Sequence, residues 1–70
     1  MIDRRILLLG KKIRSTRKEI GLSQEALAVE AELDRAYLGK IERGEKNITV
    51  AKLLQISDAL EVKMHQLIDF

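Results

Sequence analysis

The sequence contains no cysteine and no proline, a single histidine, His65, and only two aromatic residues, Tyr37 and Phe70. Without cysteine there is no disulfide framework, no thiolate zinc site and no cysteine nucleophile, and a lone histidine argues against a metal centre. The longest apolar run, Ile6 to Leu9, is far shorter than the roughly 20 residues that a membrane helix needs. No signal-peptide layout is present, so we expect a cytoplasmic protein without a membrane partner.

Catalytic machinery is also missing, because no pair of residues forms a nucleophile and a base with a third group to orient them. We therefore expect a binding protein and not an enzyme, with no cofactor and no small-molecule ligand. Its 70 residues fit one domain, spanning 1–70, which hides only about 60% of the surface of the unfolded chain. The abundance of Leu, Ile, Ala, Glu, Lys and Arg favours helices over strands.

The net charge is only +2, but the basic residues are concentrated in two clusters. Two separate basic clusters suit a polyanion such as DNA, because its phosphates attract Lys and Arg with release of condensed counterions. On charge alone, a solvated basic surface is the alternative. The first cluster contains Arg4, Arg5, Lys11, Lys12, Arg14, Arg17 and Lys18, and the second contains Arg35, Lys40, Arg43 and Lys46.

Apolar spacing and capping residues predict five helices joined by short turns, over residues 4–20, 24–31, 35–43, 50–60 and 63–68. Short connections are usual in compact helical domains, so the expected fold class is all-α. Ile20 and Val50 are among the apolar residues expected to face inward. The expected N-caps are Asp3, Ser23, Asp34 and Thr49, and the expected helix stops are Gly21 and Gly44.

The second and third helices, with a tight turn between them, predict a helix-turn-helix over about residues 23–43. Leu38, Ile41 and Glu42 share the inner face of the third helix, which leaves a polar outer face for a DNA major groove. The candidate base contacts are Arg35, Ala36, Tyr37, Gly39 and Lys40.

Arg35 is the first choice for base readout, because it lies in the first turn and its planar fork matches two acceptors of guanine. Ala36 suits a thymine methyl group. Tyr37 has two interpretations, a hydrogen bond to DNA or a packed aromatic at the rim. Gly39 either permits close approach to DNA or a neighbouring helix, or is simply tolerated at a cost of about 1 kcal/mol.

A second set of residues is expected to hold the DNA backbone without reading sequence. The free N–H groups at the start of the second helix form a phosphate site, which the Gln24 side chain reinforces. Residues around the Gly44 turn then contact the far side of the groove, unless they serve only loop solubility. The candidates are Ser23, Gln24, Arg43, Lys46 and Asn47.

Over residues 9–68 the chain resembles the Cro and phage-repressor family of helix-turn-helix proteins. The segment from Gly21 to Ala28, GLSQEALA, is similar to that family's opening motif, and YLGKIERG, residues 37–44, is similar to its continuation. The resemblance implies a compact five-helix, lambda-repressor-like DNA-binding domain. It also implies that Gln24, Arg35, Ala36 and Lys40 contact DNA. One departure is Glu32, where the family usually has Gly or Asn and a left-handed residue costs roughly 1 kcal/mol.

The same resemblance pairs Arg17 with Glu42. Both fall on otherwise apolar faces, and a buried charge persists only when it is paired, so we expect a structural salt bridge between the first and third helices. The family commonly dimerises through its fifth helix and C-terminal tail. The candidate interface residues are Met64, Ile68 and Phe70, with capping of the core as the alternative.

Within the family, the run from Leu33 to Tyr37 and the segments Arg43–Gly44 and Asn47–Thr49 look most like controller proteins of restriction-modification systems. The resulting hypothesis is a transcriptional regulator that binds a palindromic double-stranded DNA operator as a homodimer and contacts RNA polymerase. The alternatives are a small phage or plasmid repressor, and an antitoxin-like module that uses the same fold to bind a protein.

Overall fold

The computed structural model describes residues 3–70, and within that range every regular element is a helix. The helices are α1 (Arg4–Glu19), α2 (Gln24–Ala31), α3 (Arg35–Glu42), α4 (Val50–Leu60) and α5 (Met64–Leu67). This confirms the predicted all-α class and the order of the five helices, with α1, α3 and α5 slightly shorter than expected. Across residues 3–70 no helix combines the length and the apolar character needed to cross a bilayer.

The four predicted N-caps each accept a hydrogen bond from a backbone N–H in the first turn of their helix. Asp3 accepts from the N–H and the guanidinium of Arg5, and these hydrogen bonds lower the pKa of its carboxyl to about 2. The two predicted stops, Gly21 and Gly44, adopt positive φ angles of 80° and 73°. Local sequence thus sets where each of these helices begins or ends.

Two turns use glutamate where glycine would avoid strain. Glu32, at the end of α2, has φ 57° and ψ 43°, so the turn between α2 and α3 is left-handed at this glutamate and is not a differently shaped turn. The Leu33 N–H donates to the Ala28 carbonyl, 2.8 Å away, and closes this turn. Glu61 ends α4 in the same conformation, which the sequence pattern did not indicate.

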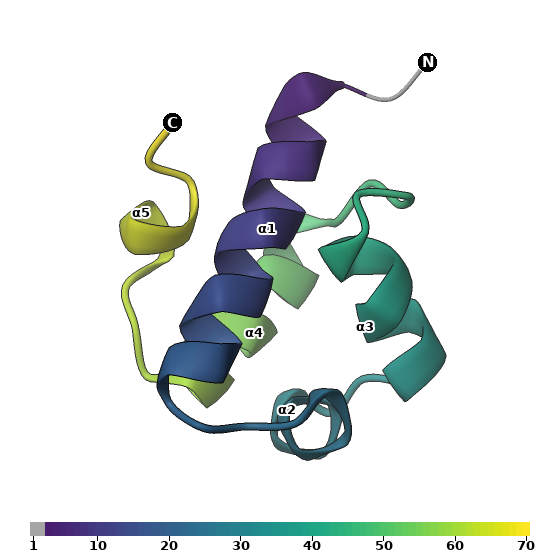
Figure 1. Cartoon of the computed structure of the whole chain (residues 1–70), viewed down its shortest axis with the longest axis vertical. Coiled ribbons are helices and arrows are strands. Elements are labelled where there is room, and N and C mark those ends of the chain that lie inside the picture. The colour runs from purple at the N-terminus through teal and green to yellow at the C-terminus, as the bar shows by residue number, and fades with distance from the viewer. Residues whose placement is uncertain (1–2) are drawn as a thin grey trace.

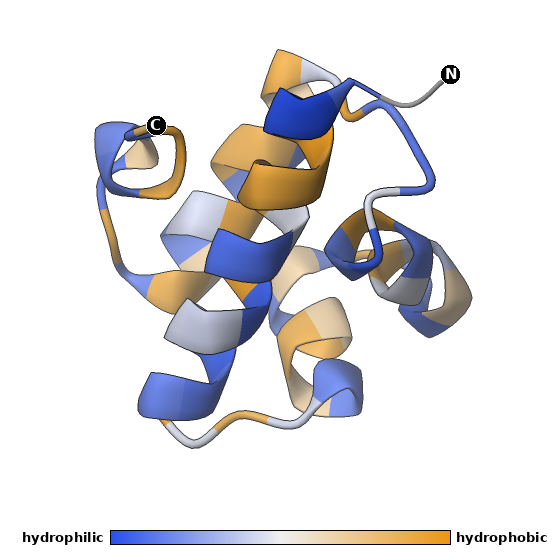
Figure 2. Ribbon diagram, turned by 45° about the horizontal axis from the view of Figure 1, so that its top comes forward, coloured by the Kyte–Doolittle hydropathy of each residue, from blue (hydrophilic) through white to orange (hydrophobic). Residues whose placement is uncertain are grey.

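The core lies between α1, α2, α3 and α4 and is closed by α5 (Figure 1). In Figure 2, α4 is hydrophobic along most of its visible length, whereas the last turn of α1 is hydrophilic. The buried apolar residues are Leu9, Ile13, Leu27, Ala28, Ala31, Leu38, Ile41, Leu53, Ile56, Leu60 and Leu67.

Two residues expected in the core are exposed instead. Ile20 is 49% exposed because α1 ends at Glu19, so this side chain has left the buried helix face. Val50 is 67% exposed because it is the first residue of α4, where the helix emerges from the loop. A helical repeat drawn from sequence does not show where packing against neighbours stops.

The helix-turn-helix is held from both sides. α1 and α2 both pack against α3, while α4 packs against α2. The Gln55 side chain of α4 donates to the Ala31 carbonyl, 2.8 Å away, at the C-terminal end of α2. These contacts leave one long side of α3 without a neighbouring helix (Figure 1).

Candidate nucleic-acid interface

The inner side of α3 fixes the helix in place. Leu38 and Ile41 are buried in the core, and Glu42 is 5% exposed. Asp34 accepts a hydrogen bond from the Tyr37 N–H at 3.2 Å, which caps the N-terminus of α3. With this side anchored, the side chains on the opposite side of α3 are presented to solvent.

The exposed side of α3 carries most of the residues predicted to contact bases. Arg35, Ala36 and Lys40 are exposed, and all three lie on the side without a neighbouring helix. Tyr37 is half-buried and packs against the core, so its position fits the rim interpretation and leaves only part of the ring accessible.

The sequence interpretation placed Gly39 on the outer face of α3, and the structure corrects this. Gly39 is buried, because the side chains of Gln24 and Arg43 lie across it. A Cβ at this position would lie 3.2 Å from Arg43 Nη1 and 3.7 Å from Gln24 Oε1. The absence of a side chain therefore makes room for two neighbouring side chains, and Gly39 itself offers no open surface to a base.

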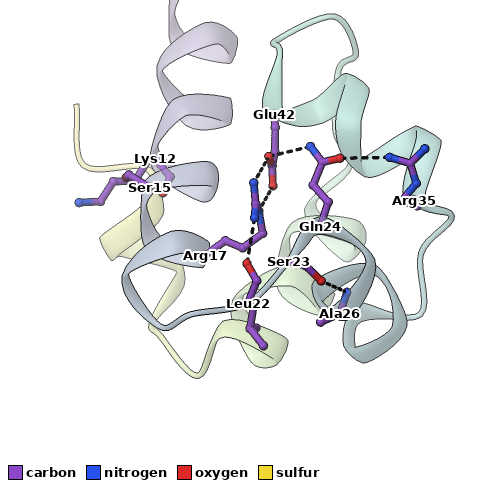
Figure 3. Close-up of polar contacts among 9 residues, drawn as sticks. All are labelled: Lys12, Ser15, Arg17, Leu22, Ser23, Gln24, Ala26, Arg35 and Glu42. Carbon is purple, nitrogen blue, oxygen red and sulfur yellow. Dashed lines mark hydrogen bonds and ion pairs between the residues drawn. The ribbon is translucent and has the colours of Figure 1, made fainter.

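The expected salt bridge between Arg17 and Glu42 is present and buried. Arg17 Nε lies 2.8 Å from Glu42 Oε2, and Arg17 Nη2 lies 3.1 Å from Glu42 Oε1. Arg17 Nη1 donates to the Leu22 carbonyl at 2.9 Å. The pair joins α1 to α3, and Arg17 also joins it to the α1–α2 turn (Figure 3).

Gln24 extends this buried pair toward the surface. Its Nε2 donates to Glu42 Oε1 at 3.0 Å, and its Oε1 accepts from Arg35 Nη1 at 3.4 Å. A continuous chain of polar contacts therefore runs from α1 through α2 to the first turn of α3 (Figure 3). Gln24 thus links the buried pair to Arg35, a contact that the sequence pattern alone did not indicate.

The remaining predicted backbone contacts flank α3. Ser23 is exposed and its hydroxyl accepts from the Ala26 N–H at 3.0 Å. Arg43, Lys46 and Asn47 are exposed at the other end of α3. Candidate phosphate contacts thus lie at the N-terminus of α2 and directly after the C-terminal end of α3.

Two charged residues outside the predicted set of DNA contacts lie close to this surface. Glu45 holds Arg43 in an exposed ion pair, with Arg43 Nε 2.7 Å from Glu45 Oε2. The hydrogen bond lowers the pKa of the Glu45 carboxyl and raises that of Arg43. Arg14 lines a hollow with Gln24 and Arg43. Its spacing of three residues from Arg17 was the available signal, since such residues lie on one side of a helix.

A family model described as helix-turn-helix matches residues 13–67, which is most of the chain. The chain belongs to this helix-turn-helix family. The prediction of a DNA-binding helix-turn-helix regulator is confirmed at this level, and the match includes α2, the Glu32 turn and α3.

Among curated relatives, the control protein C.BamHI of Bacillus amyloliquefaciens is 43% identical over 65 residues, covering 91% of this chain and 80% of the relative. The control protein C.MunI of a Mycoplasma species is 39% identical over 59 residues, covering 83% of this chain and 80% of that relative. The predicted resemblance to controller proteins is therefore confirmed.

Solved structures agree with the sequence relatives. The restriction-modification controller protein C.AhdI from Aeromonas hydrophila superposes with a TM-score of 0.91 at 35% identity, covering 93% of this chain and 98% of that one. The wild-type restriction-modification controller protein C.Esp1396I gives a TM-score of 0.88 at 33% identity, covering 96% of this chain and 87% of that one. The fold matches these controller proteins nearly end to end.

Proposed function

We propose that this helix-turn-helix protein is a controller of restriction-modification genes, which acts in the cytoplasm as one domain per subunit and binds a palindromic operator as a homodimer. The observation that carries the proposal is the exposed, polar side of α3, held outward by a buried inner side. The similarity to control proteins over 91% of the chain supports the restriction-modification role.

In this proposal α3 enters the major groove and reads base edges. Arg35 is exposed in the first turn of α3, where a guanidinium donates two parallel hydrogen bonds to guanine. Ala36 contacts a thymine methyl group beside it, and Lys40 reaches a base one turn and a half further along. Ser23, Gln24, Arg43, Lys46 and Asn47 bind phosphates on the two sides of the groove.

In the proposed homodimer, the two recognition helices enter successive major grooves about 34 Å apart. The half-sites of the operator are then centred about 10 base pairs apart. The C-terminal end supports an interface: Ile68 is 42% exposed and Phe70 is 54% exposed. Met64 is half-buried against the core, so less of it is available than the sequence suggested. The proposed mechanism also includes contact with RNA polymerase. Through this contact, occupancy of the operator changes transcription.

Replacing Arg35 with alanine should weaken specific operator binding by about 1 to 3 kcal/mol and relax preference at one position of each half-site. The physical reason is the loss of a bidentate contact to a base. Selection of bound duplexes from random DNA, followed by fluorescence anisotropy on the selected operator and its single-base variants, measures both effects.

Lys46→Ala is the control, because loss of a phosphate contact should weaken every duplex alike and reduce the salt slope by about one unit. If Arg35→Ala also weakens all sequences uniformly, Arg35 does not read a base. If the unmodified protein ignores DNA at low salt, the protein-binding alternative replaces the regulator.

Replacing Glu45 with glutamine should strengthen binding to operator and random duplexes alike. Glu45 competes with phosphates for Arg43, and the amide removes that competition while keeping the size of the side chain. A steeper salt dependence, by up to about one unit, is the expected signature of the added phosphate contact. The double variant Glu45→Gln with Arg43→Ala should lose the gain, and a gain that persists would contradict a role for Arg43.

Replacing Phe70 with glutamate should weaken self-association, because a charge then replaces an exposed apolar side chain at the proposed interface. Sedimentation equilibrium measures the dimer constant directly. Val29→Glu is the matched control, since Val29 is 75% exposed on α2 and away from the C-terminus. An unchanged dimer in the Phe70 variant would place the interface elsewhere.

A further inference from the structure

A polar hollow lies where α1, α2 and α3 meet, beside the buried ion pair. Its lining consists of Arg14, Arg17, Gln24, Glu42 and Arg43, and contains no apolar side chain. Three cations against one carboxylate give the lining a positive balance. A hollow of this composition attracts an anion.

Two of the four charges are already committed to each other. Both oxygens of Glu42 accept hydrogen bonds from Arg17, and one of them also accepts from Gln24. The third guanidinium nitrogen of Arg17 donates to the Leu22 carbonyl. The Glu42 charge is therefore neutralised inside the protein, and the positive charge that faces the hollow comes from Arg14 and Arg43.

Arg14 has no ion-pair partner among residues 3–70, and its side chain is exposed. Arg43, which also lines the hollow, forms an ion pair only with the exposed Glu45 among residues 3–70. Two guanidinium groups, one from α1 and one from the end of α3, thus flank one hollow. A phosphate is the anion that suits them, because each guanidinium offers parallel N–H donors that match phosphate oxygens.

The hollow also borders the surface proposed to read bases. Gln24 lines it and at the same time accepts a hydrogen bond from Arg35 at 3.4 Å. The side chains of Gln24 and Arg43 cover Gly39 in the middle of α3. A phosphate bound here would therefore belong to the same duplex as the bases that face Arg35.

We infer that Arg14 binds one phosphate of the DNA backbone in this hollow, opposite Arg43 and beside Gln24, so that the DNA contact surface extends from α3 onto α1. The inference rests on the proposed DNA-binding function and adds α1 to it. Because a phosphate contact carries no sequence information, Arg14 sets affinity and register and leaves base preference unchanged.

The first test compares Arg14→Ala with Lys12→Ala. Lys12→Ala removes the same charge from the same helix, and the Lys12 side chain points away from the ion-pair network (Figure 3). Anisotropy on the selected operator and on a random duplex, between about 0.05 and 0.3 M salt, gives affinity and salt slope. Arg14→Ala should lower both affinities about eightfold at 0.1 M salt and reduce both slopes by about 0.9. Lys12→Ala should leave the slopes unchanged.

The second test locates the phosphate. Operators that carry one neutral methylphosphonate each are titrated with the unmodified protein and with Arg14→Ala. One substitution per half-site should weaken the unmodified protein and leave the variant almost unaffected, because both changes remove the same contact. Arg14→Lys should restore most of the salt slope, since lysine retains the point charge.

Folding and dimerisation are checked for all three variants by thermal melting and sedimentation. An Arg14→Ala slope equal to that of the unmodified protein, or equal sensitivity of both proteins to every methylphosphonate, would overturn the inference. Either result leaves the proposed function standing as long as Arg35→Ala still relaxes base preference. Failure of the unmodified protein to bind any duplex overturns the proposed function itself.

Discussion

Replacing Arg17 with alanine is expected to cost about 3 to 5 kcal/mol of folding free energy, enough to unfold much of a domain this small. The change leaves the Glu42 carboxylate in a buried site, 5% exposed, with only the Gln24 amide as hydrogen-bond partner. It also removes the donor to the Leu22 carbonyl. Circular dichroism during urea titration measures the loss.

A double variant separates the ion pair from general packing. Arg17→Met combined with Glu42→Leu removes both charges, and apolar replacements for a buried pair are often nearly neutral. We expect recovery of most of the stability, with a residual loss because Leu22 and Gln24 each lose a partner. If Arg17→Ala is as stable as the unmodified protein, the pair contributes nothing and Glu42 finds water.

Replacing Gly10 with alanine is expected to destabilise the fold by about 3 kcal/mol, the upper end for overpacking. Gly10 is buried where α1 crosses the end of α3. An added Cβ would lie 2.7 Å from the Glu42 carbonyl oxygen and closer still to that of Ile41. Both obstacles are backbone atoms, so the helices must move apart, which strains the neighbouring ion pair as well.

Gly39→Ala provides the matched control. This second helical glycine meets mainly the tip of the flexible Arg43 side chain, so the same added methyl group should be accommodated. Removal of a helical glycine then raises stability by up to about 1 kcal/mol. Thermal melting of the two variants should move in opposite directions. A Gly10 variant as stable as the Gly39 variant would contradict the close helix contact.

The C-terminal end shows how far a pattern of apolar residues can be interpreted. Met64, Ile68 and Phe70 look alike in sequence as exposed candidates for an interface. The structure separates them, because Met64 opens α5 and packs inward one turn before the buried Leu67, whereas Ile68 and Phe70 follow the helix and remain exposed. Exposure depends on where the last turn meets the core.

Local chemistry in the chain was sufficient to predict the five helices and the N-caps at which four of them begin. Asp3, Ser23, Asp34 and Thr49 cap because their side-chain oxygens reach backbone N–H groups in the first turn, which depends only on nearby residues. The outward positions of Arg35, Ala36 and Lys40 follow from the helical repeat once Leu38 and Ile41 are assigned to the core.

Contacts between segments far apart in the chain were decided by tertiary structure alone. The burial of Gly39, the link from Gln24 to Arg35 and the hollow beside Arg14 all depend on how α1, α2 and α3 come together. The Arg17–Glu42 pair was expected from family resemblance and from the need to neutralise buried charge. Its extension through Gln24 was not, because a sequence repeat fixes the face of a helix but not the distance between helices.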